Sequence, residues 1–161
     1  MRVLVVLAPL LLAGCGLQPL YSGGSDGQVA QALAGVEVAP IPGRNGWLVR
    51  NALRDRIAAV PEGGTARYRL EIELDDRIEG FGIRRDDAIT RERRTLRARY
   101  KLVDAGSGAM LVDATAGSDA GIDVVRSEYA TIAAENTAIE RLAQEVADQI
   151  VARIALYARR Q

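Results

Sequence analysis

Three stretches in the middle of the chain alternate apolar and polar residues, which is the pattern of strands that bury only one face. They cover residues 67–75, about 88–103 and 109 to about 116. Residues 104–108 read Asp-Ala-Gly-Ser-Gly, the composition of a tight turn between the second and third stretch. We therefore predict three antiparallel strands that follow one another as a meander.

Two other stretches repeat apolar residues with the period of amphipathic helices. The first covers residues 44–60 and is stopped by Pro61, and the second begins at Glu128 or Thr131 and ends at Arg159. A short strand at residues 36–39 precedes both helices and ends at Pro40. The expected buried positions are Val49, Leu53, Ile57 and Val60 in the first helix and Ile132, Ile139, Leu142, Ala143, Val146, Ile150, Ile154 and Tyr157 in the second.

The order of these elements is strand, helix, three strands and helix, which predicts an α+β fold. A sheet that is apolar on one face can be covered by two amphipathic helices on that face. We therefore expect a two-layer sandwich with a small, mostly antiparallel sheet of about four strands and two helices on one side. The second face of the sheet would remain uncovered.

Residues 76–87 are less regular, and an extension of the strands is one interpretation of them. The triplet Gly80-Phe81-Gly82 is expected at or near a turn, with Phe81 exposed at a loop tip. Trp47, in the first helix, is expected in the core. The adjacent carboxylates Asp75-Asp76 and Asp86-Asp87 are expected in turns and at solvated strand ends. They are poor catalytic pairs, because neighbouring residues of a strand point to opposite faces.

The start of the chain has the parts of a secretory signal: Arg2, an apolar run at residues 3–12, and the small residues Ala13 and Gly14 before Cys15. The run is too short to cross a bilayer, which takes about 20 apolar residues. Residues 12–15, Leu-Ala-Gly-Cys, resemble the lipobox of bacterial lipoproteins. The resemblance implies cleavage between Gly14 and Cys15 and lipidation of Cys15, with a buried N-terminal helix or an uncleaved anchor as alternatives.

The chain then divides into three parts. Residues 1–14 are the expected lipoprotein signal peptide, and residues 15–34 the lipidated N-terminus and flexible tether, in which 22–27 is rich in glycine and serine. A helical turn is expected at residues 28–34. Residues 35–161 form the expected single α+β domain.

Composition argues against an enzyme, because the chain has no histidine and its single cysteine is the expected lipid attachment site. We predict no catalytic residues, no metal site and no cofactor apart from the covalent lipid on Cys15. The equal numbers of basic and acidic residues give no support for binding to nucleic acid.

A row of basic residues on the second long strand is the sharpest remaining feature. Residues two apart on a strand stand about 6.6–6.8 Å from each other on one face, so the row forms a comb suited to phosphate or sugar-acid groups. The alternative is a cross-strand ion ladder with Glu71, Glu73 and Asp75, which the basic residues outnumber. The members of this basic stripe are Arg91, Arg93, Arg97, Arg99 and Lys101.

Several short motifs resemble the LptE family of lipopolysaccharide-assembly lipoproteins. The resemblance begins beside the lipobox, where Leu17 replaces an aromatic residue frequent in the family. It extends over essentially the whole chain after the signal. The motifs are Gly16-Leu17-Gln18-Pro19-Leu20-Tyr21, Tyr68-Arg69-Leu70, Leu96-Arg97-Ala98-Arg99-Tyr100-Lys101-Leu102-Val103-Asp104, Ser107-Gly108 and Ser127-Glu128-Tyr129-Ala130.

The resemblance implies a non-enzymatic lipoprotein of the Gram-negative outer membrane, anchored by lipid and facing the periplasm and a barrel lumen. Its expected partners are the LptD β-barrel, which it plugs and helps to assemble, and lipopolysaccharide. Gly16 after Cys15 agrees with sorting to the outer membrane. The basic stripe and Phe81 then become candidate contacts to lipopolysaccharide or to the barrel. Alternatives are an auxiliary lipoprotein of an ABC-type lipid transport system and, less favoured, a periplasmic hydrolase.

Overall fold

The predicted meander forms the centre of a four-stranded sheet. The computed structural model describes residues 27–57, 65–83 and 89–160. Strands β2 (Tyr68–Ile83), β3 (Ile89–Asp104) and β4 (Met110–Asp123) are antiparallel neighbours, and the short β1 (Val36–Val38) pairs with β2 in parallel. The strand order β1-β2-β3-β4 therefore confirms the mostly antiparallel sheet.

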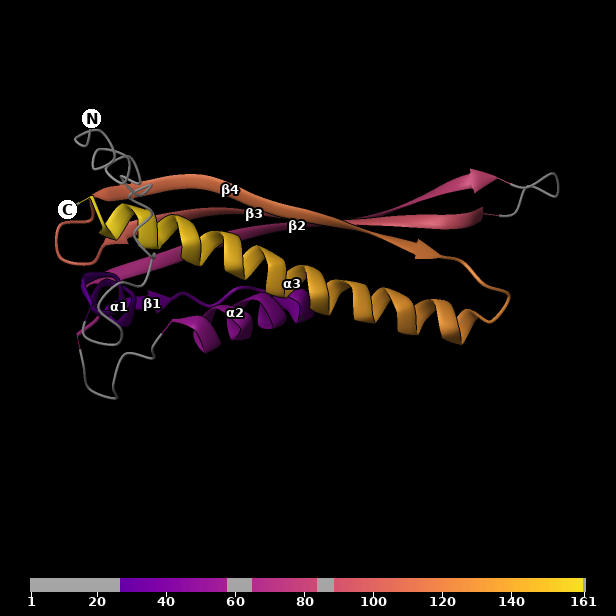
Figure 1. Cartoon of the computed structure of the whole chain (residues 1–161), viewed down its shortest axis with the longest axis horizontal. Coiled ribbons are helices and arrows are strands. Elements are labelled where there is room, and N and C mark those ends of the chain that lie inside the picture. The colour runs from indigo at the N-terminus through magenta and orange to yellow at the C-terminus, as the bar shows by residue number, and fades with distance from the viewer. Residues whose placement is uncertain (1–26, 58–64, 84–88, 161) are drawn as a thin grey trace, which may run out of the picture.

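Two helices cover one face of this sheet, as predicted (Figure 1). The helix α2 (Gly43–Arg56) packs beside the much longer α3 (Glu128–Ala158), which runs along β3 and β4. A third, short helix, α1 (Gln28–Ala34), packs at one end of α3. Its Val29 and Leu33 are buried, so the predicted helical turn joins the end of the expected tether to the folded unit.

The core lies between the two layers and follows the two predicted periodicities. Apolar side chains at even positions of β2 and β3 face the helices and are mostly buried, although Ile78 toward the end of β2 is 43% exposed. Val49, Leu53 and Ile57 of the predicted α2 stripe are buried as well; Val60 lies outside the described residues. The predicted stripe of α3 is buried or partly buried from Ile139 onward, but Ile132 is 47% exposed. Ile132 precedes Asn136, the point on α3 to which Arg44 at the start of α2 donates a hydrogen bond, so no helix packs beside it.

Two strands extend farther than composition predicts. β4 reaches Asp123 rather than residue 116, and β2 reaches Ile83, so that Gly80-Phe81-Gly82 lies within a strand and not in a loop. Gly82 takes a positive φ of 78°, and its carbonyl accepts a hydrogen bond from the Thr90 hydroxyl across the hairpin. Both segments, the end of β2 and the end of β4, pair with β3 and therefore form strands despite their loop-like composition.

The expectation that Trp47 is buried is wrong, because its side chain is 61% exposed. The buried face of α2 contains the neighbouring Gly46 instead. A Cβ on Gly46 would stand 2.5 Å from the carbonyl oxygen of Ile41, so this face of α2 approaches the preceding loop too closely for a side chain. Trp47 therefore points away from the core.

A polar network lies between the layers, where the sequence predicted solvated carboxylates. Asp76 accepts hydrogen bonds from Arg94 at 2.9 Å and 2.6 Å, and a third from Asn45 of α2 at 2.7 Å. Arg94 also donates to the main-chain carbonyl of Glu135 in α3, at 3.0 Å. The two side chains are only 9% and 18% exposed, Arg94 and Asp76 respectively, so the placement predicted for Asp76 is wrong. Asp86 and Asp87 lie outside the described residues.

Candidate functional site

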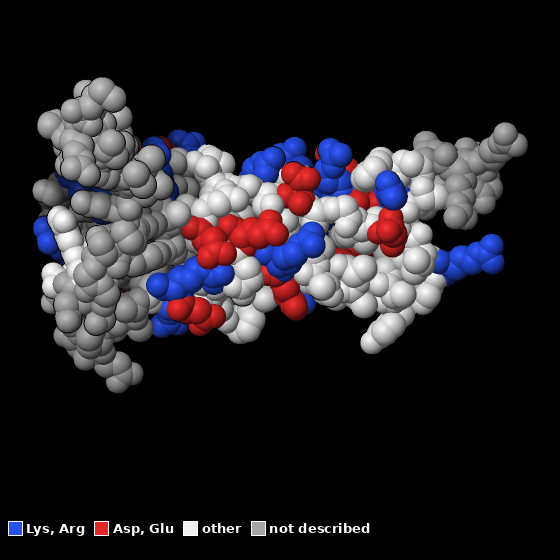
Figure 2. Space-filling model, in the orientation of Figure 1, with Lys and Arg blue, Asp and Glu red and all other residues white. Residues whose placement is uncertain are grey.

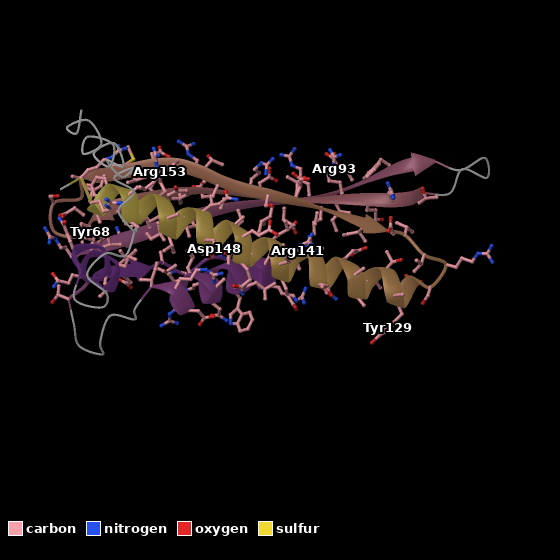
Figure 3. All side chains as sticks on the ribbon, viewed as in Figure 1. Tyr68, Arg93, Tyr129, Arg141, Asp148 and Arg153 are labelled. Atoms are coloured by element: carbon pink, nitrogen blue, oxygen red, sulfur yellow. The ribbon has the colours of Figure 1, made fainter. Side chains whose placement is uncertain are left out.

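The face of the sheet opposite the helices, here called the open face, holds the predicted basic stripe. Odd-numbered residues of β3 point to this face, and all five stripe residues are exposed or half-exposed there, whereas Leu96, Ala98, Tyr100 and Leu102 are buried on the other side. Arg93 points away from the helices in Figure 3. The strand alternation therefore brings the stripe together on one solvent-facing surface.

The register places the stripe between acidic residues on both neighbouring strands. Lys101, Arg99 and Arg97 lie directly opposite Glu71, Glu73 and Asp75 of β2, as the ion-ladder interpretation requires. The ion pairs, however, join other partners. Arg99 binds Asp113 and Arg91 binds Asp123, both on β4, at 3.2 Å and 3.1 Å. On β2, Glu71 and Asp75 instead pair with arginines of their own strand, Arg69 and Arg77.

Acidic residues on β4 offset the excess of positive charge that the sequence suggested for this face. β4 adds acidic residues that were not counted with the stripe, and among the described strand residues acidic groups slightly outnumber basic ones on the open face. Figure 2 views the sheet along its edge, and basic and acidic side chains alternate there along the upper rim, where the strands lie. The basic residues are Arg69, Arg77, Arg91, Arg93, Arg97, Arg99 and Lys101; the acidic ones are Glu37, Glu71, Glu73, Asp75, Glu79, Asp113, Asp119 and Asp123.

Within the described residues, three members of the basic stripe form no ion pair: Arg93, Arg97 and Lys101. The guanidinium of Arg93 lies over the ring of Phe81, 5.4 Å from its centroid. Arg97 crosses Gly117 of β4, where a Cβ would stand 2.5 Å from its Cδ and Nη1 atoms. A guanidinium stacked on a ring keeps its edges free, so Arg93 remains able to bind an anion bidentately. Arg97 is a second candidate because no ion pair within the described residues uses its charge.

The structure thus brings Phe81 and the stripe together, although Phe81 lies in β2 and not at a loop tip. Cys15 and Gly14, the predicted lipidation and cleavage positions, lie outside the described residues. Arg94, which has the parity of the buried face of β3, was not among the predicted residues. An arginine among Leu96, Ala98 and Tyr100 is itself the signal for an internal acidic partner.

The Arg99–Asp113 pair gives a pH-dependent prediction. The hydrogen bond from Arg99 lowers the pKa of the Asp113 carboxyl below its ordinary value. A lowered pKa contributes stability at pH values above the ordinary pKa, and that contribution is lost as the pH falls through the lowered one. NMR titration of Asp113 should therefore show an acid-shifted midpoint that returns toward the ordinary value in Arg99→Gln. An equal midpoint in both proteins would contradict the pairing.

In the described part of the chain, no helix is long and apolar enough to span a membrane. Within the same residues, no group of three or more histidine, cysteine, aspartate or glutamate side chains is placed to hold a metal ion.

A family model described as "Lipopolysaccharide-assembly" matches residues 33–154, which include the sheet and nearly all of α3. The chain belongs to the LptE family. Membership agrees with the resemblance stated from the motifs, gives the protein a role in lipopolysaccharide assembly, and carries an outer-membrane location with it.

Solved structures agree with the family in fold. A protein from Caulobacter crescentus is 25% identical with a TM-score of 0.68, and the match covers 84% of this chain and all of the other. The rare lipoprotein B of Shewanella oneidensis is 12% identical, with a TM-score of 0.58 over 75% of this chain and 92% of its own. A lipoprotein B from Nitrosomonas europaea, also 12% identical, has a TM-score of 0.58 over 76% and 81%. Among curated proteins, no significant match to the chain was found.

Proposed function

We propose that the protein is the lipid-anchored subunit of an outer-membrane lipopolysaccharide translocon. In this proposal it occupies the lumen of the LptD β-barrel, assists assembly of that barrel and takes part in inserting lipopolysaccharide at the cell surface. The observation that carries the proposal is the family match over residues 33–154. The inferred role is one of binding and not of catalysis.

The physical character of the open face supports a lumenal position. The interior of a large transmembrane barrel is polar, since its apolar residues face the lipid. A body that fills such a lumen needs an exposed surface of hydrogen-bonding and charged groups. The open face supplies both signs of charge on three long strands, which suits a polar wall better than a lipid surface.

Arg93 and Arg97 are the members of the stripe best suited to an anionic partner. Their charges are not used by ion pairs within the described residues, whereas Arg91 and Arg99 are already paired with carboxylates. Anionic groups of lipopolysaccharide and carboxylates of the barrel lumen offer the same chemistry to a guanidinium. Binding of purified lipopolysaccharide in the absence of a barrel distinguishes these two sources.

Depletion of the protein is the direct test of the function. We expect the level of assembled LptD barrel and the amount of surface lipopolysaccharide to fall together, because a barrel without its subunit assembles poorly. Normal levels of both after depletion would refute the proposal. Recovery of inner-membrane transporter subunits alone in a pull-down would instead favour an ABC-type transport auxiliary.

The anchor is tested separately with Cys15→Ala in the full chain. A lipid on Cys15 is expected to hold the protein in the membrane fraction, since several acyl chains bind far more stably than one. The variant should therefore lack a lipid mass at its N-terminus, and in cells without the barrel, which would otherwise retain it, it should appear in the soluble fraction. A lipid mass that persists in the variant, or unchanged membrane fractionation without the barrel, would show that Cys15 is not the anchor, while the depletion result would stand independently.

A further inference from the structure

The outer edge of β4 has no neighbouring strand in the described part of the chain, and among the same residues its main-chain groups find hydrogen-bond partners only near the middle. At Gly117 both main-chain groups point away from β3 and bind the side-chain amide of Gln149 in α3. The Gly117 N–H donates to Oε1 and the Gln149 amide nitrogen donates to the Gly117 carbonyl, both at 3.1 Å. Gln149 therefore takes the place of a neighbouring strand at this one residue.

The side chain of the next residue also binds α3. The hydroxyl of Ser118 donates a hydrogen bond to the carboxylate of Glu145, which in turn forms an ion pair at 3.6 Å with Arg141, one helical turn earlier. These side chains fasten α3 to the middle of β4 and mark where the closed part of the edge ends.

From Asp119 to Asp123 the edge is open. Main-chain groups of a strand alternate between its two edges, so residues with the parity of Gly117 also point outward. The hydrogen bond from the Val124 N–H to the Thr90 carbonyl shows the opposite parity bonding to β3. No hydrogen bond from the described part of the chain reaches the outward main-chain groups of Asp119 or Gly121. An extended segment could therefore pair with them.

The space needed by such a segment is present beside this edge. A hollow of about 410 Å³ lies between the end of β4 and α3, with Gly121, Ile122 and Asp123 on one side and Ala134, Thr137, Ala138 and Arg141 on the other. A Cβ built on Gly121, which has the parity of the open face, has no atom within 4 Å, so the open face is also clear beside this edge. The small side chains of α3 thus leave room for apolar side chains of an added strand.

The charges beside the open edge select the partner. Asp119 and Asp123 are exposed on the open face. Arg91 of β3 forms an ion pair with one carboxylate oxygen of Asp123, Oδ1. Antiparallel pairing of two copies of β4 about Gly121 would place Asp119 opposite Asp123, and like charges directly opposite each other are destabilising. A second copy of this chain is therefore disfavoured, and basic residues on the open face of the added strand are favoured.

We propose that the edge of β4 from Asp119 to Asp123 binds an extended protein segment by β-strand addition. The segment alternates basic residues, which pair with the two aspartates, and apolar residues, which enter the hollow beside α3. Main-chain hydrogen bonds provide the affinity, and the alternation provides the choice of partner. The Gln149 amide limits the site, because it occupies the edge at Gly117.

The test uses the full chain and two short peptides, one alternating arginine with valine and one alternating glutamate with valine. We expect saturable binding of the basic peptide, with slowed hydrogen exchange at the Gly121 N–H, and no binding of the acidic one. Gly121→Pro removes the outward N–H at an edge position, where proline is tolerated, and should weaken binding by roughly tenfold or more. The matched control Gly121→Ala keeps the N–H and fills only empty space, so its binding should be unchanged.

A second measurement does not depend on the folding of Gly121→Pro. The basic peptide methylated on the main-chain nitrogens that face β4 should lose binding to the unaltered protein, whereas methylation on the opposite edge should not. The proposal is overturned if neither peptide binds, because the aspartates would then only repel other edges. It is also overturned if both peptides bind equally, or if methylation on either edge has the same effect.

Discussion

Asp76→Ala is expected to lower the free energy of unfolding by about 3–5 kcal/mol, the usual cost of removing one partner from a buried ion pair. Arg94 would remain between the layers with only the Glu135 carbonyl as a hydrogen-bond acceptor, and the Asn45 amide would lose its acceptor on Asp76. An unpaired guanidinium at this depth is costly because the surrounding dielectric is low. Urea unfolding followed by circular dichroism measures the change.

The neighbouring residue supplies the matched control. Asp75 is also a carboxylate paired with an arginine, at 2.8 Å, but it lies on the open face with 53% of its side chain exposed. Asp75→Ala should therefore cost less than about 1 kcal/mol. Exchanging both buried partners, as Asp76→Leu with Arg94→Met, should recover much of the stability lost in the single variant. Equal costs for Asp76→Ala and Asp75→Ala would contradict the buried network.

The double variant Arg93→Gln, Arg97→Gln is expected to weaken binding to purified lipopolysaccharide, to the barrel, or to both, by roughly tenfold or more, since two charge-assisted contacts are lost. Its unfolding free energy should change by less than about 0.5 kcal/mol, because neither arginine forms an ion pair within the described residues. Lipopolysaccharide binding in vitro and recovery of the barrel in pull-downs are the two measurements.

The paired arginines of the same stripe are the control. Arg91→Gln, Arg99→Gln removes equal charge but breaks the pairs with Asp123 and Asp113, both exposed, and should lower stability only slightly, because exposed ion pairs contribute little. Its binding should fall less than that of the first variant. Equal loss of binding in the two variants would indicate that only total charge matters. Unchanged binding in both would exclude the stripe as a contact surface.

The strand and helix periodicities were enough to predict the layers, because burial on one side of an element depends on its own sequence. Alternation along β3 placed Arg97 and Leu96 on opposite faces correctly. The ends of β2 and β4 were not predictable in the same way. Their glycine-rich segments resemble loops in composition, and only pairing with β3 makes them strands.

The details of the site depended on contacts between distant parts of the chain. The stripe was correctly assigned to one face, but its ion partners Asp113 and Asp123 come from β4, whose register with β3 includes an irregularity near Leu102 that sequence does not reveal. Asp76 was misplaced because its burial depends on Asn45 in α2 and Glu135 in α3 reaching the same point. The local pattern predicts on which face of its strand or helix a residue lies, but not which residues of other elements contact it there.

The unequal lengths of α2 and α3 leave one end of the helical layer a single helix wide. α3 has 31 residues, or roughly 46 Å at ~1.5 Å per residue, whereas α2 has 14 and reaches only from Asp148 back to Asn136. In Figure 1, α1, β1 and α2 gather toward one end, and at the other end α3 alone accompanies the three long strands. Since α3 is longer than the ~30 Å hydrocarbon core of a bilayer, a membrane-spanning lumen that enclosed this protein lengthwise would leave part of α3 outside the hydrocarbon region.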